Sequence, residues 1–176
     1  MLAMSGEEGF STAAPATTIS DSALFIQACK LYEAKNDSAA AELFFKLAKE
    51  FPNSERAPEA LYFAGVLFYK EKMYPSALSA FRMYAEQSPD GKQINEALHW
   101  TGMCYYAMER YREAIEAFDE EISRFPNSQF RRDALKFMGI SYIMIGDTAR
   151  GNEILRKLVE ERSDYYQPEY WFSRDI

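Results

Sequence analysis

The sequence repeats itself with a period of 37 residues, and this period limits the chain to a narrow set of folds. Proline recurs at Pro52, Pro89 and Pro126, each 37 residues after the last. A fixed period of about 20–50 residues is typical of a solenoid, in which each unit is one supersecondary motif packed on its neighbours. Such arrays mostly bind other proteins along an extended surface, so the period bears on function as well as on fold. Further sets of residues keep the same step: Ala40, Ala77, Ala114 and Gly151; Phe44, Phe81, Phe118 and Leu155; Gly65, Gly102 and Gly139; Phe68, Tyr105 and Tyr142.

Each unit contains two stretches in which apolar residues recur at three- and four-residue spacing, and this predicts two amphipathic helices. The breaks between the helices of one unit are one or two residues long, as at Lys72-Met73 and Arg110. Such short breaks favour antiparallel neighbours. The first predicted helix runs from Asp21 to the break at Asn36, and the others span about 38–50, 57–71, 74–87, 94–109, 111–124, 130–145 and 147–162.

Glycine stands in the middle of a predicted helix at Gly65, Gly102 and Gly139. Glycine inside a helix costs about 0.5–1 kcal/mol relative to alanine, so three such residues in phase indicate a close helix approach. We expect their packing partners to be the small residues of the second helices, namely Ala40, Ala77, Ala114 and Gly151.

The array divides the chain into three parts. Residues 1–20 are rich in Gly, Ser, Thr, Ala and Pro and are predicted to form a flexible N-terminal segment. The repeats occupy 21–163, at about 21–56, 57–93, 94–129 and 130–163. Residues 164–176 are crowded with aromatic side chains, and Phe172 lies 37 residues after Leu135. This last segment is predicted to be a short helix that caps the array, or, if the natural chain continues, an exposed apolar edge.

The charge and hydropathy of the chain exclude some classes of partner. The net charge is −7 and no basic run is present, so a nucleic-acid partner is not expected. No stretch approaches the roughly 20 apolar residues of a membrane helix, and the first residues do not resemble a signal peptide. Cys29 and Cys104 are two repeats apart, too far for a disulfide, and are expected to be buried. The chain is therefore expected in the cytoplasm or, with a signal peptide removed, in the periplasm.

The in-phase residues resemble the tetratricopeptide repeat, which has a large apolar residue, Gly, Tyr, Ala, Phe and Pro at fixed spacing. The third unit matches with Leu98, Gly102, Tyr105, Ala114, Phe118 and Pro126, and the second with Leu61, Gly65, Phe68, Ala77, Phe81 and Pro89. The outer units depart from the pattern, as terminal repeats commonly do. The resemblance covers roughly residues 22–163 and implies an all-α, right-handed α–α superhelix of about four helix-turn-helix repeats.

The period is longer than the usual tetratricopeptide length of about 34 residues. The extra residues follow the proline, in Asn53-Ser54-Glu55, Asp90-Gly91-Lys92 and Asn127-Ser128-Gln129. Long repeats of this kind resemble those of two groups of bacterial envelope proteins, the periplasmic partner of the Tol–Pal system and the lipoprotein of outer-membrane barrel assembly. The sequence has no N-terminal cysteine that could carry a lipid, which weighs against the second group.

The resemblance implies that the first helices of successive units line a concave trough. The residues that it places there are mostly aromatic or apolar, with charged residues nearby at Glu33, Glu59, Lys70, Glu96 and Asp133. Tyrosine and methionine are suited to adaptable contacts with a bound peptide or helix. The expected partner-binding residues are Phe25, Tyr32, Tyr62, Val66, Tyr69, His99, Met103, Tyr106, Ile140 and Ile143.

Two functions compete for this trough. In the first, the chain is a scaffold that holds a protein or peptide partner within a bacterial envelope complex. In the second, the chain associates with itself, and the trough is filled by its own tail or by a second copy. Carriage of a lipid or small molecule is a third and weaker hypothesis. The trough lacks the Lys, Asn and Arg clamp of chaperone-binding tetratricopeptide domains, so capture of an acidic C-terminus is not expected.

An enzyme is not expected from this sequence. His99 is the only histidine, which excludes a His-rich metal site. No glycine-rich phosphate loop precedes a helix. The acidic run Asp119, Glu120 and Glu121 is more typical of a solvated helix face than of an acid–base pair. The sequence therefore predicts no catalytic residue, no metal and no cofactor.

Overall fold

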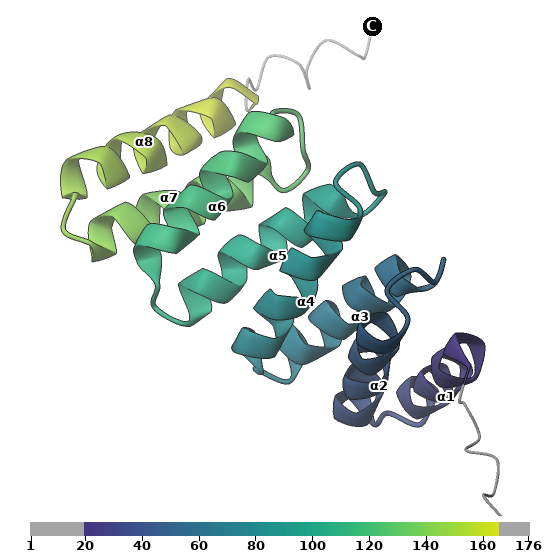
Figure 1. Ribbon diagram of the computed structural model, residues 1–176. Coiled ribbons are helices and arrows are strands. Elements are labelled where there is room, and N and C mark those ends of the chain that lie inside the picture. The colour runs from purple at the N-terminus through teal and green to yellow at the C-terminus, as the bar shows by residue number, and fades with distance from the viewer. Residues whose placement is uncertain (1–19, 166–176) are drawn as a thin grey trace, which may run out of the picture.

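The computed structural model describes residues 20–165, and within this range it consists of eight helices and contains no strand (Figure 1). The helices lie side by side in chain order from one end of the molecule to the other (Figure 1). The predicted all-α repeat fold is confirmed, and each helix lies within two or three residues of its expected bounds. The helices are α1 (Asp21–Glu33), α2 (Asp37–Glu50), α3 (Ala57–Lys70), α4 (Tyr74–Gln87), α5 (Ile94–Ala107), α6 (Tyr111–Arg124), α7 (Arg131–Met144) and α8 (Thr148–Tyr165).

The helices form two layers. Every helix packs on the next one in the chain, and in addition α3 contacts α5 and α5 contacts α7. The first helices of the repeats are thus neighbours in one layer, whereas the second helices, α2, α4, α6 and α8, form the other. The predicted tail segment, residues 164–176, and the predicted flexible segment, residues 1–20, lie almost wholly outside the described residues.

The turn between the two helices of a repeat has the same geometry in all four repeats. One residue of this turn has a positive φ, in the left-handed region. This residue is glycine only in the last repeat, and in the other repeats it is a lysine or glutamate, for which the conformation costs about 1–2 kcal/mol. The next residue donates its N–H five residues back, as from Met73 to the Phe68 carbonyl at 2.8 Å. This is the hydrogen bond of a Schellman C-cap, which ends the first helix at a fixed point. The left-handed residues are Lys35 (φ 61), Lys72 (φ 60), Glu109 (φ 60) and Gly146 (φ 90).

An aromatic ring lies directly on the helix glycine in the two central repeats. A Cβ built on Gly65 would stand 2.6 Å from Cε1 of Phe81, and one built on Gly102 would stand 2.5 Å from Cε1 of Phe118. Both phenylalanines are fully buried. The lack of a side chain at each glycine therefore leaves room for a ring from the second helix of the same repeat.

In the central repeats the atoms nearest to the position of a glycine Cβ belong to the ring, which lies one helical turn after the alanine expected as the partner. In the fourth repeat they include the backbone of another small residue. There a Cβ on Gly151 would lie 2.6 Å from the carbonyl oxygen of Gly139. Leu155 stands where the other repeats have phenylalanine, and it lies 3.0 Å from a Cβ built on Gly139.

The third repeat buries an ionisable pair. Glu121 has no exposed surface and His99 is 6% exposed, and His99 Nδ1 lies 3.0 Å from Glu121 Oε2. The His99 ring stacks on Phe130 with a centroid distance of 4.8 Å and also borders Phe118 at 6.0 Å. No described residue forms a hydrogen bond with the second carboxyl oxygen of Glu121, Oε1.

The burial of Glu121 corrects its assignment to a solvated acidic face, although Asp119 and Glu120 are exposed as expected. Glu121 follows Phe118 by three residues, so both lie on the same face of α6. The period places Glu121 in the same register as three buried residues, Leu47, Tyr84 and Leu158. The side chain therefore stands at a core position that the other repeats fill with a larger apolar surface.

Replacing Gly102 with leucine is predicted to destabilise the protein by about 1–3 kcal/mol or more, because the new side chain needs the space of the Phe118 ring. Chemical denaturation would measure the free energy of unfolding. Glu42→Leu, at an exposed position in the middle of α2, is the matched control and should change stability little. An unchanged unfolding midpoint for Gly102→Leu would contradict the ring-on-glycine contact.

Replacing Glu121 with alanine is predicted to cost about 3 kcal/mol, because His99 is left buried without its partner and a cavity forms. The double variant His99→Phe, Glu121→Leu copies the first repeat, which has Phe25 and Leu47 at these positions. We expect it to match or exceed the wild type in stability, since buried ion pairs are often no better than apolar pairs of similar volume. Asp119→Ala is the exposed control. A double variant as unstable as Glu121→Ala would show that the unpaired partner is not the cause.

Candidate functional site

The candidate site is the surface formed by the first helices of the four repeats, α1, α3, α5 and α7. We call this surface the trough. Its floor is a row of apolar side chains at a step of 37 residues, and all of them are partly exposed. Because they occupy one register of neighbouring helices, they form a continuous apolar row. This row consists of Cys29, Val66, Met103 and Ile140.

A second row is aromatic, and neighbouring repeats hold it in place. The Tyr69 ring packs on Trp100 of the next repeat with a centroid distance of 4.8 Å, and Tyr106 packs on Phe137 in the same way at 4.9 Å. Tyr74 also borders the Tyr69 ring from α4, at 5.4 Å. Tyr69 and Tyr106 are nevertheless partly exposed, so each offers a fixed surface to a partner.

The remaining members of the predicted site differ in exposure. Tyr32, at the N-terminal end of the aromatic row, is 50% exposed, whereas Ile143 at the other end is half-buried. Phe25 and Tyr62 are half-buried. The guanidinium of Arg56 lies over the Phe25 ring, 4.9 Å from its centroid. The trough thus presents its most accessible aromatic ring near its first repeat.

His99 does not belong to the accessible surface. Its ring is turned into the core by the contacts with Glu121 and Phe130, so this side chain cannot meet a partner without leaving the core. One repeat further on, the same register holds Lys136, which is exposed and whose ammonium group lies 4.9 Å from the Phe137 ring centroid. Phe25, Tyr62, His99 and Lys136 occupy one register, and the accessible surface along this register is therefore interrupted at His99 in the third repeat.

Carboxylates follow one edge of the trough. Glu59, Glu96 and Asp133 occupy the same register of α3, α5 and α7. The Tyr62 hydroxyl donates a hydrogen bond to Glu96 Oε2, which links α3 to α5. Burial and this carboxylate raise the pKa of Tyr62 above its usual value, so the phenol stays protonated as a donor. Lys70, the cation expected nearby, is bound by the carboxylate of Asp37.

The two cysteines lie in different surroundings. Cys104 is buried, and burial raises the pKa of its thiol to about 12, so this thiol is not a nucleophile at neutral pH. Cys29 is half-buried in the trough floor, and burial followed by the charges of Glu33 and Glu59 raises its pKa as well. Neither thiol is activated.

Within residues 20–165, no group of three or more His, Cys, Asp and Glu side chains is arranged to hold a metal ion. In the same range, no helix has both the length and the apolar character needed to cross a membrane. The described part of the trough offers aromatic, apolar and hydrogen-bonding contacts, which are the contacts that recognise a polypeptide.

The side chains that support the aromatic row were not among the residues predicted from the sequence. Trp100 and Phe137 share a register with Phe63 and Ile26, so the period itself carried the signal. Trp100 and Phe137 lie next to expected trough positions along α5 and α7, but their rings point toward the preceding repeat. There each ring packs on a tyrosine of the aromatic row, Trp100 on Tyr69 and Phe137 on Tyr106.

Solved structures share this fold at low sequence identity, and no curated protein matches the chain. MamA from Desulfovibrio magneticus RS-1, from its residue 41 onward, is 22% identical over 83% of this chain and 78% of that chain, with a TM-score of 0.64. MamA MSR-1 is 17% identical over 84% of this chain and 81% of that chain, with a TM-score of 0.67. The TPR-like repeats of a kinesin light chain from Podosopora anserina are 10% identical, with coverages of 84% and 77% and a TM-score of 0.65.

The family model described as YfiO, outer membrane lipoprotein, matches residues 17–143. Of the two groups of envelope proteins that the long repeat resembles, the match is to the lipoprotein group, although the missing N-terminal cysteine weighed against it. The match rests on the repeats and not on the first residues of the sequence. Because it runs over most of the chain, from the first repeat into the fourth, the chain belongs to the YfiO family of outer membrane lipoproteins.

Proposed function

We propose that the chain is a non-enzymatic scaffold that binds a peptide or protein segment in the trough, within a complex of the bacterial envelope. The observation that carries this proposal is the aromatic row. Tyr69 and Tyr106 are fixed by Trp100 and Phe137 but remain partly exposed. A surface that is already ordered before binding loses little side-chain entropy when a partner arrives, and this favours recognition.

The chemistry of the trough favours an amphipathic segment as the partner. The apolar row around Val66 and Met103 would contact apolar side chains, while the edge with Glu59 and Asp133 would contact polar or basic ones. A helix or an extended peptide can present both kinds of side chain on opposite sides. Membership of an outer membrane lipoprotein family supports a periplasmic location for this complex.

A second candidate function is self-association, and it rests on the ends of the array. Ile26 occupies the register in which Phe63, Trp100 and Phe137 meet the preceding repeat, and it is 55% exposed. At the other end of the described array, Val159 on α8 is 69% exposed. Stacking the end of one copy on the start of another would cover Ile26.

Ile26→Asp should abolish any oligomer seen by gel filtration with light scattering, and an oligomer that persists would exclude this contact.

The trough proposal predicts that the double variant Tyr69→Ala, Tyr106→Ala loses its partner. Truncating central aromatic anchors costs about 2 kcal/mol or more, which corresponds to about a 30-fold weaker affinity. The measurement is a pull-down from an envelope extract with the intact chain, followed by titration of the captured partner. Met103→Glu, which adds a charge to the floor and leaves both tyrosines in place, should weaken binding as well.

The matched control is Glu42→Ala, an exposed change on α2 in the outer layer. It should capture the same partner with unchanged affinity. Circular dichroism would verify that every variant remains helical. Capture that is equally strong with the trough variants would place recognition elsewhere and overturn the proposal.

A further inference from the structure

A hollow of about 390 Å³ lies between α4 and α6, on a different side of α5 from the trough. Its floor is formed by Leu98, Thr101 and Tyr105 of α5, and its walls by side chains of α4 and α6. We call this hollow the valley. The floor residues are turned by about 120° around α5 from the trough residues Met103 and Tyr106. A ligand in the valley would therefore not meet one in the trough.

The valley lies where the second repeat lacks a ring that the first repeat has, since the register of Phe45 holds charged residues, Arg82, Asp119 and Arg156, in the later repeats. In the first repeat, Phe45 on α2 packs edge-on against Phe68 on α3 with a centroid distance of 5.9 Å. In the second repeat, Arg82 stands at the position of Phe45 and is exposed. Among the described residues, no ring of α4 packs on Tyr105, the residue equivalent to Phe68. The guanidinium of Arg110 lies over the Tyr105 ring instead, 4.8 Å from its centroid.

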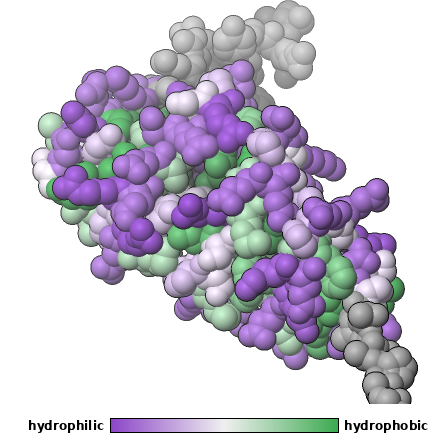
Figure 2. Space-filling model, in the orientation of Figure 1, coloured by the Kyte–Doolittle hydropathy of each residue, from purple (hydrophilic) through white to green (hydrophobic). Residues whose placement is uncertain are grey.

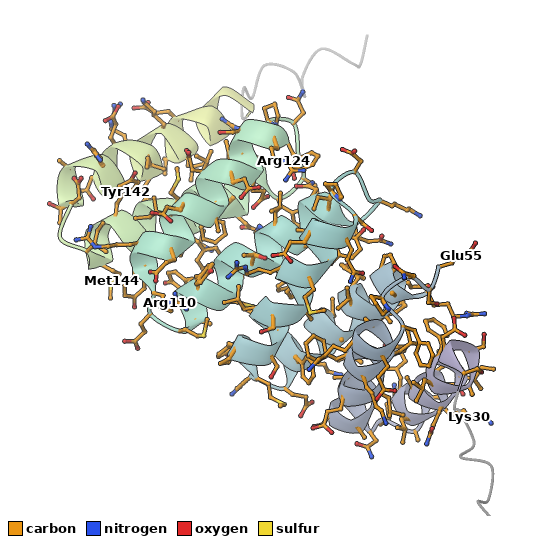
Figure 3. All side chains as sticks on the ribbon, in the orientation of Figure 1. Lys30, Glu55, Arg110, Arg124, Tyr142 and Met144 are labelled. Carbon is orange, nitrogen blue, oxygen red and sulfur yellow. The ribbon has the colours of Figure 1, made fainter. Side chains whose placement is uncertain are left out.

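Four glutamates line the valley, and two of them are already paired. Glu113 accepts a hydrogen bond from Arg110, and Glu120 accepts one from Arg124. These two arginines belong to opposite ends of α6 (Figure 3). Arg124 also donates to the carbonyl oxygen of Pro89, so both of its terminal nitrogens bind groups of the protein itself.

The other two glutamates, Glu86 and Glu116, form no hydrogen bond or ion pair with any residue in the described part of the chain. The same holds for Arg82, so the unpaired carboxylates of the valley exceed its unpaired cations. The face seen in Figure 2 shows apolar residues between hydrophilic ones rather than a uniform charged surface. A lysine or arginine suits such a place, because its methylene stem can lie on an apolar floor while its head group meets the carboxylates.

We propose that the valley is a second interaction surface, which takes a segment of a protein partner that carries lysine or arginine beside apolar residues. The charge of the whole chain, −7, favours such a basic partner, and the acidic valley does not complement another acidic valley. This inference does not depend on the function of the trough, since the two surfaces share no residue.

The test uses the full chain labelled with ¹⁵N and a short amphipathic peptide of lysine and leucine, with blocked ends. The expected result is a set of chemical-shift changes on valley residues, Thr101, Tyr105 and Ala117 among them, that weaken as salt is added. The same peptide with glutamate in place of lysine should cause none of them. Shifts confined to the trough, or equal shifts with the acidic peptide, would overturn the proposal, as would the absence of shifts at millimolar peptide.

Two variants test separately the role of the unpaired carboxylates and the role of the open space. Glu86→Gln, Glu116→Gln removes the unpaired carboxylates and should weaken binding about tenfold, the effect of two partly exposed ion pairs. Arg82→Phe introduces the residue that fills this place in the first repeat, and it should block the valley while the protein stays at least as stable. Glu42→Gln is the matched control, because Glu42 has the register of Glu116 but borders no valley.

The control should bind the peptide as the wild type does. Binding that survives Arg82→Phe would show that the hollow is not the site. Shifts of valley residues that depend on protein concentration in the absence of peptide would identify a second copy as the occupant and overturn the assignment to a basic partner. Tyr69→Ala, Tyr106→Ala should leave these shifts unchanged, so failure of the valley and failure of the trough are distinguishable.

Discussion

The contact on which the array depends is the aromatic ring against the helix glycine. In the central repeats the rings of Phe81 and Phe118 lie where a side chain of Gly65 or Gly102 would stand. This contact fixes how closely and at which point the two helices of a repeat meet. Because each repeat has the same pairing, it presents an equivalent surface to the next repeat, and the first helices lie beside one another. The trough is a consequence of this alignment, because it consists of equivalent positions on adjacent helices.

The turn inside each repeat serves the same geometry at some cost. A left-handed residue ends the first helix in every repeat, although only Gly146 accepts that conformation freely. The cost of about 1–2 kcal/mol at Lys35, Lys72 and Glu109 is tolerated because the Schellman hydrogen bonds and the core packing around them require the turn. A repeat array accumulates such local requirements, since each unit is stable mainly through its neighbours.

The period was enough to predict the helices and the number of repeats, because these features depend on properties that every unit shares. The layer expected to form the trough came from the resemblance to the tetratricopeptide repeat. The period was not enough for residues that depart from their register. Glu121 was assigned to the surface because it follows two other acids, but its register is a core position shared with Leu47 and Tyr84. His99 was assigned to the trough by the same register, and its contact with Glu121 turns it inward. A pairing between two atypical residues on different helices cannot be seen in either helix alone.

The departures from the repeat are therefore where this chain differs from a generic solenoid. Shared positions such as Phe81 and Phe118 maintain the fold, and any helical repeat protein needs their equivalents. Glu121 is such a departure, because it stands where the second repeat has Tyr84, and it pairs with His99 in the core. Phe45 is another, because the later repeats have charged residues in its register, so the place that a ring fills in the first repeat is left open in the second as the valley. The burial of an acid where the other repeats have a larger apolar side chain does not improve the packing, since buried charged groups are often no better than apolar ones of similar volume. The His99–Glu121 pair therefore needs another explanation than stability, whereas the valley follows from the residue type that is usual in its register.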